Sequence, residues 1–162
     1  MQVREATQAD IDVILLIVDE ARNIMRETGN ATQWDNGYPS REIISDDINR
    51  RQAFICVADG EIAGYFCFIK GTDPDPNYTA IEGAWLDDAP YGVIHRLASG
   101  RKVKGIARKA FDFAFSQTSN IRVDTHHDNI PMQNFLKKAG FTYCGVIYVH
   151  DGTPRDAFQK KL

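Results

Sequence analysis

A short loop between residues 100 and 105, GRKVKG, sets three cations directly before an amphipathic helix. A helix N-terminus already carries a partial positive charge and several backbone N–H groups without partners. Acidic side chains are therefore expected at this place, whereas the chain supplies Arg101, Lys102 and Lys104. The pattern indicates either a site for an anion, held by backbone N–H groups and cations together, or a basic turn that faces water.

Two familiar phosphate-binding motifs do not fit this loop. Gly100 and Gly105 match the spacing of a Walker A loop, but Ile106 and Ala107 follow where that motif needs Lys and then Ser or Thr. The G-x-G-x-x-G fingerprint of dinucleotide-binding folds is absent. What remains is a basic glycine loop that joins a strand to a helix, and its anion has to be identified from the rest of the chain.

The bulk composition fits a single domain over residues 1–162 with an ordinary core. A net charge of −3 argues against a nucleic-acid partner, because chains that bind nucleic acid usually carry a basic surplus. The N-terminal segment has no signal-peptide layout, and no apolar stretch approaches membrane-spanning length, so no membrane partner is expected. The three cysteines are odd in number and lie among apolar neighbours, which predicts reduced thiols in a cytoplasmic protein.

Hydrophobic periodicity and turn residues predict an α/β (α+β) chain with a central mixed sheet. The clearest signal is a hairpin over residues 53–69, because two β-rich runs flank the turn dipeptide Asp59-Gly60. The segment 78–86 is ambiguous and fits a short strand or a single turn. The other predicted strands cover residues 3–5, 92–99, 121–125, 141–149 and 156–162. The predicted helices run from Thr7 or Asp10 to Gly29, from Ser40 past Ile48, over 105–117 and over 129–140.

Residues 93–149 resemble the GCN5-related N-acetyltransferase (GNAT) family most closely. The family's pyrophosphate loop reads Arg/Gln-x-x-Gly-x-Gly/Ala, and residues 102–107 match it, with Lys in place of the usual Arg or Gln. The segment DNIPMQNFLKKAGF resembles the family's fourth-helix motif, in which an Asn, here Asn129, precedes a helix that ends in Lys-x-Gly-Phe. The predicted order of strands and helices is also that of the family, so the resemblance covers essentially the whole chain.

The resemblance implies a GNAT fold, with a mixed, mostly antiparallel sheet flanked by helices, and acetyl-CoA (coenzyme A) as cofactor. The pyrophosphate would lie on the basic loop, and Asn129 would touch the pantetheine arm. In this fold the pantetheine pairs like an extra strand with the edge of residues 95–99, so the backbone of Leu97 and Ser99 is expected to hold it. The further cofactor-binding residues that the resemblance implies are Arg101, Lys102, Val103, Lys104, Gly105, Ile106 and Ala107.

Acetyl transfer to an amine needs a group that removes a proton from the nitrogen. His95 is the first choice, because it lies on the strand that leads to the cofactor loop and its reference pKa of about 6.5 suits a base near neutrality. Strand alternation would put His95, Leu97 and Ser99 on one side. The alternative is a histidine hydrogen-bonded in the core. Glu82 is the rival base, since the family often uses a glutamate nearby. The other interpretation of Glu82 is an exposed acid in a loop without a catalytic role.

Two further catalytic tasks follow from the resemblance. The thioester oxygen needs a hydrogen-bond donor, which a backbone N–H of Leu97 or Ala98 could supply at the bulge where residues 95–99 splay away from the neighbouring strand. Relatives place a tyrosine in the fourth helix as general acid, but this chain has Leu136 there, which cannot donate a proton. The replacements to consider are Tyr143, Tyr148, Ser99, a bound water or no acid at all.

Aromatic residues in loops are candidates for the acceptor pocket. Trp34 and Tyr38 lie in the loop before the second helix, a region that lines this pocket in the family, and Trp85 could form another wall. The alternative is a loop anchored by buried aromatic side chains. Rings that face the site would favour a flat or apolar primary amine. The acids that could attract its cationic head are Asp35, Asp87 and Asp88.

The run His126, His127 and Asp128 invites a metal site. Neighbouring residues on an extended segment point apart, however, and no second cluster matches this one, so no metal is expected. Asp128 and Asn129 suit a helix cap instead.

The sequence thus predicts an acetyl-CoA-dependent N-acetyltransferase that moves an acetyl group directly to a primary amine of a small molecule. Two alternatives stay open. One is a non-catalytic domain of the same fold that binds or senses acyl-CoA, which the missing tyrosine favours. The other is acetylation of a protein N-terminus or lysine. The closing strands could also pair across a homodimer.

Overall fold

The computed structural model describes all residues from Met1 to Leu162. Its helices are α1 (Ile11–Glu27), α2 (Arg41–Asn49), α3 (Ile106–Gln117) and α4 (Ile130–Lys138), with 3₁₀ turns at Gln8–Asp10 and Pro76–Tyr78. Its strands are β1 (Gln2–Glu5), β2 (Ala53–Ala58), β3 (Glu61–Gly71), β4 (Glu82–Gly83), β5 (Tyr91–Ser99), β6 (Asn120–Thr125), β7 (Thr142–Tyr148) and β8 (Pro154–Lys161). They form one eight-stranded sheet in the order β1-β2-β3-β5-β6-β8-β7-β4.

Every neighbouring pair of strands is antiparallel except β5 and β6, so the predicted mixed, mostly antiparallel sheet is confirmed. The predicted hairpin is β2–β3, and Asp59 and Gly60 have φ of 51° and 78°, as a type I′ turn requires. The ambiguous segment 78–86 contributes only β4, which pairs with β7 at the edge of the sheet. β8 lies inside the sheet, between β6 and β7, so it is not free to pair across a dimer.

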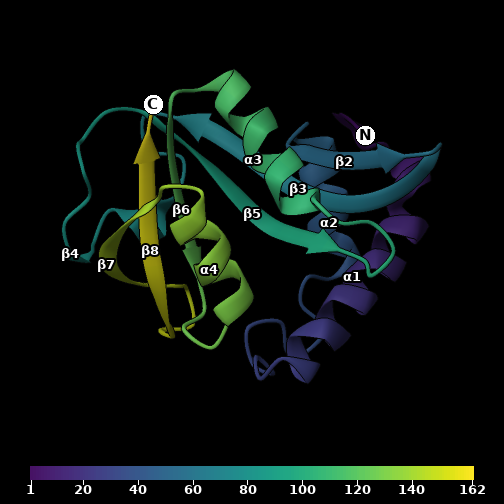
Figure 1. Ribbon diagram of the computed structural model, residues 1–162, viewed down its shortest axis with the longest axis horizontal. Coiled ribbons are helices and arrows are strands. Elements are labelled where there is room, and N and C mark those ends of the chain that lie inside the picture. Colours follow the sequence, from purple (N-terminus) through teal and green to yellow (C-terminus); the bar gives the residue numbers. More distant parts are fainter.

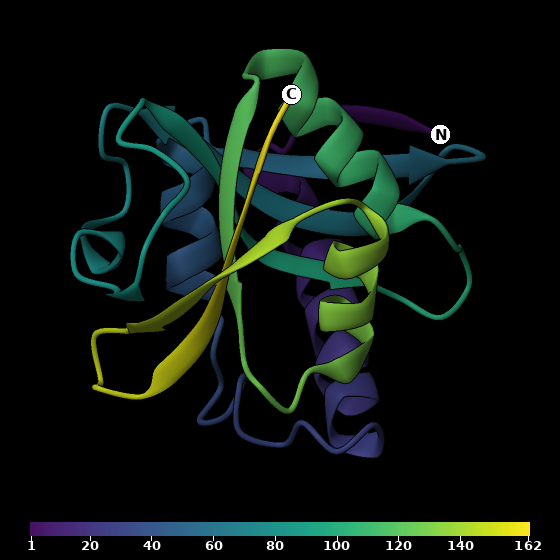
Figure 2. The same cartoon turned by 60° about the vertical axis from the view of Figure 1, so that its left-hand side comes forward.

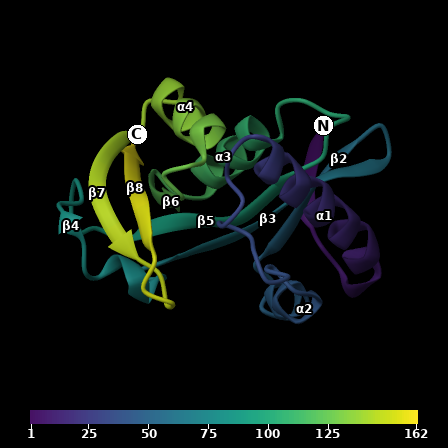
Figure 3. The same cartoon turned by 90° about the horizontal axis from the view of Figure 1, so that it is seen from below.

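Helices cover both faces of the sheet, as Figure 3 shows. α1 and α2 pack on one face in a core cluster that contains Ile55 and Tyr65. α3 and α4 pack on the other face, around Phe66 and Ile121. Tyr65 and Phe66 are neighbours on β3 and point to opposite faces, as strand geometry requires. Central strands that are buried on both faces explain why their sequences are almost continuously apolar.

The parallel strands β5 and β6 stay together only at one end. Their pairs are Gly92 with Ile121 and Val93 with Arg122. Beyond these pairs the strands diverge, and Figure 1 shows β5 running diagonally away from β6. The divergence leaves the facing backbone N–H and C=O groups of the two strands without a ladder partner, and it opens the middle of the sheet.

A bulge in β5 changes the direction in which its side chains point. Arg96 and Leu97 together oppose the single residue Phe66 of β3, and Arg96 has a positive φ of 52°. The prediction that His95 and Leu97 share one side of the strand is therefore wrong, because the extra residue shifts the alternation. Leu97 packs against the core cluster beneath α3, whereas His95 pairs with an acid outside that cluster.

The three cysteines, Cys56, Cys67 and Cys144, are buried free thiols. Burial raises the pKa of Cys56 to about 11 and that of Cys67 to about 12. Thiols with such pKa values are poor nucleophiles at neutral pH. Among the helices, none combines the length and the apolar composition needed to cross a membrane.

Candidate active site

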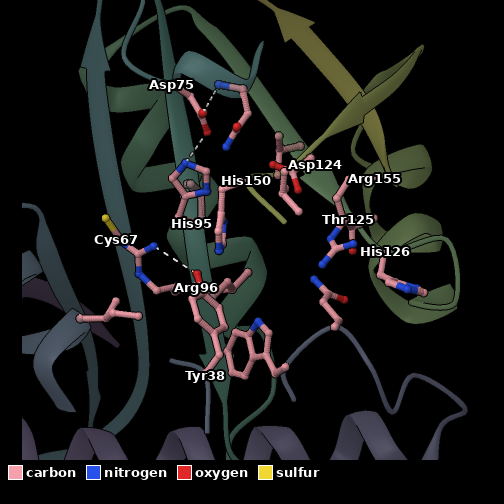
Figure 4. Close-up of a pocket in the computed structure, with 18 of the residues that line it drawn as sticks. Tyr38, Cys67, Asp75, His95, Arg96, Asp124, Thr125, His126, His150 and Arg155 are labelled. Atoms are coloured by element: carbon pink, nitrogen blue, oxygen red, sulfur yellow. Dashed lines mark hydrogen bonds and ion pairs between the residues drawn. The ribbon is translucent and has the colours of Figure 1, made fainter. Parts of the chain in front are cut away.

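A cavity of about 740 Å³ opens where β5 and β6 diverge (Figure 4). Its walls come from the loop 32–38, from α2, from the segment 74–77, from the diverging parts of β5 and β6, and from the turn between β7 and β8. The cavity is therefore assembled from segments that lie far apart in the sequence. Its apolar lining includes Ile94, Leu97, Phe111, Val123 and Met132.

His95 lines this cavity and is paired with Asp75. His95 Nε2 lies 2.9 Å from Asp75 Oδ2, while Asp75 Oδ1 accepts the N–H of Asn77 at 2.9 Å, which fixes the carboxylate. Burial acts to raise the pKa of Asp75, but the hydrogen bond and charge of His95, together with the Asn77 N–H, bring this pKa below its usual value. An ionised Asp75 accepts the Nε2 proton, so Nδ1 is the nitrogen of His95 that can take up another proton.

Asp124 approaches from β6, on the other side of the divergence, and Figure 4 shows it across the cavity from His95. Its Oδ2 accepts the Tyr78 hydroxyl at 2.5 Å. Burial raises the pKa of Asp124, although the charge of His95 and the Tyr78 hydrogen bond act in the opposite direction. One ligand atom each from Asp75, His95 and Asp124 lie within 4.8 Å of one another. Two acids and an imidazole from three segments therefore meet at one point.

Arg96 fastens the bulge of β5 to α2. Its Nη2 and Nε donate to the two carboxylate oxygens of buried Asp47 at 2.6 and 2.8 Å. Asp47 also accepts the Tyr65 hydroxyl at 2.6 Å, and Arg96 Nη1 donates to the Tyr38 hydroxyl at 3.3 Å. A buried, doubly hydrogen-bonded ion pair of this kind holds the unusual backbone of Arg96 in place.

Of the predicted acceptor residues, Trp34 and Tyr38 line the cavity and Trp85 does not. Trp34 is only 5% exposed and meets the Tyr38 ring edge-on at 6.5 Å, so it both anchors the loop and borders the cavity. Trp85 packs on Tyr78 and beneath the Arg122 guanidinium, outside the cavity.

Of the acidic residues that the sequence suggested for the site, only one borders the cavity. Glu82 is exposed on β4, where it accepts the Tyr148 hydroxyl at 3.0 Å, and it does not line the cavity. Asp35 borders the cavity, whereas Asp87 and Asp88 do not. The acids nearest His95, Asp75 and Asp124, were not singled out by sequence reasoning. Asp124 carried a weak signal, as an acid inside an otherwise buried strand.

The side chains of His126, His127 and Asp128 lie closer together than predicted. Their ligand atoms are within 4.8 Å of one another and the two imidazole rings stack at 4.7 Å, because the chain turns here and is not extended. His126 Nδ1 accepts the N–H of Asp128 at 3.0 Å, and Nε2 lies 3.2 Å from the Thr32 hydroxyl. Both ring nitrogens of His126 are thus used within the protein. Burial lowers the pKa of His126, in keeping with a neutral ring.

A second cavity, of about 500 Å³, lies at the basic loop, which projects from the end of β5 before α3 (Figure 2). Gly105, with φ of 84°, precedes α3, and neither a capping side chain nor a first-turn acid is present. Ser40 and Asn129, by contrast, cap α2 and α4 through their side-chain oxygens. The first N–H groups of α3 are therefore left for a ligand or water.

The predicted loop residues differ in their surroundings. Lys104 and Arg101 line the second cavity, while Lys102 is exposed and does not. Both carboxylate oxygens of Glu27 accept from Arg101 Nη2 at 2.7 Å, and Glu20 accepts the Arg101 N–H at 2.6 Å. The loop is thus tied to α1, and Arg101 is already partly neutralised. Val103, Gly105, Ile106, Ala107 and Ser99 also line this cavity.

Asn129 and Leu136, the two residues of interest in the fourth-helix motif, both make their contacts within the protein. Asn129 lines the larger cavity, but its Oδ1 accepts the Met132 N–H at 3.2 Å and its amide donates to Gln33 at 3.1 Å. Leu136 is fully buried in the core. The tyrosines proposed to replace its missing hydroxyl, Tyr143 and Tyr148, are exposed and line neither cavity.

Diverging parallel strands, a bulged central strand and an uncapped helix behind a basic loop define an acyltransferase fold. The sequence model of the Acetyltransferase (GNAT) family matches residues 18–141, which is most of the chain. The chain belongs to this family and is an N-acetyltransferase; the family uses acetyl-CoA.

Solved structures agree with this assignment. A GNAT acetyltransferase from Streptococcus agalactiae is 36% identical over 99% of this chain and 95% of that chain, with a TM-score of 0.88. A ribosomal-protein-alanine N-acetyltransferase from Brucella melitensis is 14% identical over 100% of both chains, with a TM-score of 0.65. The aminoglycoside acetyltransferase AAC(6′)-Ib, in complex with coenzyme A, is 18% identical over 99% of this chain and 94% of that chain, with a TM-score of 0.66. The last two share the fold alone. No curated protein is similar enough to count as a match.

Proposed function

We propose that this acetyltransferase moves an acetyl group from acetyl-CoA directly to a primary amine of a small molecule, with His95 as the base. One observation carries the proposal. His95 stands at the bulge of β5, beside the divergence from β6, with Nε2 on Asp75 and Nδ1 without a protein partner. It therefore combines access to a cavity with a ring nitrogen that no protein group occupies.

The residues present fit acetyl-CoA. The uncapped start of α3 and the cations of the loop suit a pyrophosphate, and the unpaired edge of β5 suits the pantetheine amides. Lys104, Gly105, Ile106 and Ala107 would hold the pyrophosphate, with Lys102 and Arg101 adding charge. The backbone of Leu97 and Ser99 would hold the pantetheine, with Asn129 beside it. Bound acetyl-CoA supplies the acetyl group as a reactive thioester.

Groups of the chain itself then remove the proton and stabilise the carbonyl oxygen. His95 Nδ1 takes a proton from the amine, and a backbone N–H of Leu97 or Ala98 donates to the carbonyl oxygen. The C–N bond forms, the C–S bond breaks, and the proton that His95 removed from the amine passes to the departing sulfur. A thiol has a pKa of about 8.5, so its thiolate leaves without an obligatory acid. A tyrosine at position 136 is therefore not required by this chemistry.

The deciding experiment is a titration of acetyl-CoA by calorimetry, followed by a thiol-release assay with small amines and with peptides. Saturable release with small amines, and not with peptide N-termini or lysines, is expected. Release with peptides alone would favour the protein acetyltransferase. Tight binding without turnover on any acceptor would favour the sensing domain, and absence of binding would overturn the proposal.

The three free cysteines favour a reducing compartment, so the proposal places the enzyme in the cytoplasm, which a fractionation experiment can test.

A further inference from the structure

A buried threonine at the divergence of β5 and β6 has a hydroxyl that no protein group satisfies. Thr125 lines the larger cavity, is only 1% exposed, and its Oγ1 has no hydrogen-bond partner in the protein. Figure 4 shows this residue on the β6 side of the cavity. Buried hydroxyls normally have a partner, so a molecule in the cavity is expected to supply one.

The polar side chains around Thr125 do not share this feature. Asp124, which precedes it, accepts the Tyr78 hydroxyl, and His126, which follows it, has both ring nitrogens engaged within the protein. Asn129, at the start of α4, likewise accepts and donates within the protein. The unsatisfied hydroxyl is therefore a property of this one position and not of a loosely packed region.

Strand alternation shows which part of the cavity the hydroxyl faces. Val123, two residues earlier on β6, belongs to the core cluster around α3 and α4, so Thr125 points to the same face of the sheet and Asp124 to the other. Leu97 and Met132 pack against this cluster and also line the cavity, which thus passes through the gap between the strands. The uncapped start of α3 lies on this side too, so acetyl-CoA would reach the gap from the side of Thr125.

The register of β5 and β6 gives the position of Thr125 along the gap. Val93 pairs with Arg122 in the parallel part of the two strands. Three residues further along each strand come Arg96 and Thr125, so Thr125 lies across the gap from the bulge of β5. The backbone N–H groups proposed to hold the thioester oxygen belong to the same bulge. A thioester held there has its carbon between the bulge and Thr125.

We propose that the Thr125 hydroxyl donates a hydrogen bond to the sulfur of acetyl-CoA and stabilises the thiolate as it leaves. The inference rests on the proposed acetyltransferase function and adds a catalytic residue to it. The thioester carbon carries an oxygen, a sulfur and a methyl group in one plane. When the oxygen lies on the bulge of β5, the sulfur or the methyl group faces β6, and only the sulfur can accept a hydrogen bond.

The hydroxyl serves the leaving group without losing its own proton. When the C–S bond breaks, its electron pair stays on the sulfur, and the negative charge strengthens the hydrogen bond from Thr125. The proton that finally reaches the sulfur is the one that His95 removed from the amine. Thr125 thus supplies from β6 the hydrogen-bond donor that Leu136 cannot supply from α4.

The test compares Thr125→Val, which removes the hydroxyl and keeps the shape, with Thr125→Ser, which keeps the hydroxyl. Thr153→Val is the matched control, because Thr153 lines the same cavity but its hydroxyl donates to Asp151 at 2.6 Å. The ligands are coenzyme A and desulfo-coenzyme A, which lacks the thiol. Calorimetry measures binding, and the ultraviolet absorbance of the thiolate measures ionisation of the bound thiol as the pH is raised.

Thr125→Val should raise the pKa of the bound coenzyme A thiol, because a hydrogen bond to the thiolate lowers that pKa. At a given pH the ratio of thiolate to thiol should be about tenfold smaller than in the wild type, as for the loss of one charge-assisted hydrogen bond. His95 and Asp124 also act on this thiol, but they are the same in both proteins. Thr125→Ser should restore the ratio, and Thr153→Val should change it less than about twofold.

Two further measurements separate this role from a structural one. At a pH above the ordinary thiol pKa of about 8.5, Thr125→Val should weaken coenzyme A about tenfold and desulfo-coenzyme A less than about twofold. In the ligand-free protein its urea midpoint should be unchanged or higher, because an apolar group of the same shape replaces an unsatisfied hydroxyl. Thiol release in a single turnover should slow about tenfold and recover in Thr125→Ser.

Three outcomes would overturn the assignment. The same thiol pKa in complexes of the wild type and Thr125→Val would mean that the hydroxyl does not reach the sulfur. An equal loss of affinity for coenzyme A and desulfo-coenzyme A would place the hydroxyl on the pantetheine arm. A clear loss of stability in ligand-free Thr125→Val would show that the hydroxyl has a partner within the protein.

The proposed function fails separately. A protein whose bound thiol responds to Thr125→Val, but which releases no thiol with any amine, would refute amine acetylation and leave the contact with the sulfur standing. Absence of coenzyme A binding would overturn both proposals.

Discussion

The two cavities are built in opposite ways. The smaller one is formed mainly by a single continuous segment, residues 99–108, and is basic. The larger one gathers residues from the loop before α2, from α2 itself, from three strands and from two turns, and places acids beside a histidine. The smaller cavity is therefore suited to a part of the ligand that is the same in every reaction cycle. The larger cavity can change its specificity by single substitutions on several segments.

The largest expected effect concerns the larger cavity. His95→Ala should lower kcat at saturating acetyl-CoA by about 10²- to 10⁴-fold, the usual contribution of a general base. Coenzyme A affinity should not change, because the basic loop is untouched. His127→Ala, which alters an exposed histidine outside the cavity, is the control and should retain its kcat. An unaltered kcat and pH–rate profile in His95→Ala would remove His95 from the role of base.

The ion pair beneath the larger cavity should matter for stability. Asp47→Ala leaves the Arg96 guanidinium buried without its partner and should lower the free energy of unfolding by about 3–5 kcal/mol. Urea denaturation measures this change. Asp46→Ala, at the neighbouring exposed position, breaks only a surface pair and should cost less than about 1 kcal/mol. Similar values for the two variants would mean that Arg96 finds other partners and that the bulge does not depend on Asp47.

A smaller effect is expected where the family's tyrosine is missing. Leu136→Tyr should destabilise the protein by about 1–3 kcal/mol without raising kcat, because the side chain is fully buried against the core and overpacking forces its neighbours apart. Leu136→Met, which nearly preserves volume, should cost less than about 1.5 kcal/mol. A gain in kcat for Leu136→Tyr would show that a hydroxyl at this position reaches the reacting atoms.

The smallest effect is expected at the basic loop. Lys104→Ala should weaken coenzyme A binding about three- to tenfold at low salt, and less at high salt, since the lysine is exposed and its charge is screened. Lys102→Ala should have a smaller effect, because Lys102 does not line the cavity. Lys138→Ala, in the last turn of α4, controls for the change in net charge. A stronger effect of Lys102→Ala would place the pyrophosphate further from α3 than the proposal does.

Much of the fold could be predicted because its signals are local. Asp59-Gly60 marked the β2–β3 hairpin, and Ser40 and Asn129 marked two helix starts. The resemblance implied a bulge within residues 95–99, but its position at Arg96 could not be predicted, since no turn residue marks it and the partner Asp47 is 49 positions away. Strand alternation therefore predicted the wrong side of β5 for the Leu97 side chain. Segment 78–86 was ambiguous because β4 forms only through pairing with β7, far along the chain.

The sequence by itself determined the basic loop, the helix that follows it and the candidate His95, because each is a property of a short continuous segment. Only the tertiary structure decided that Asp75 and Asp124 lie beside His95, and that Glu82, Trp85 and Leu136 lie away from the cavity. Asp75 and Asp124 belong to a loop and to β6 and are separated by 49 residues, so no local rule relates them. The physical reason is that the divergence of β5 and β6 sets which distant side chains share one space.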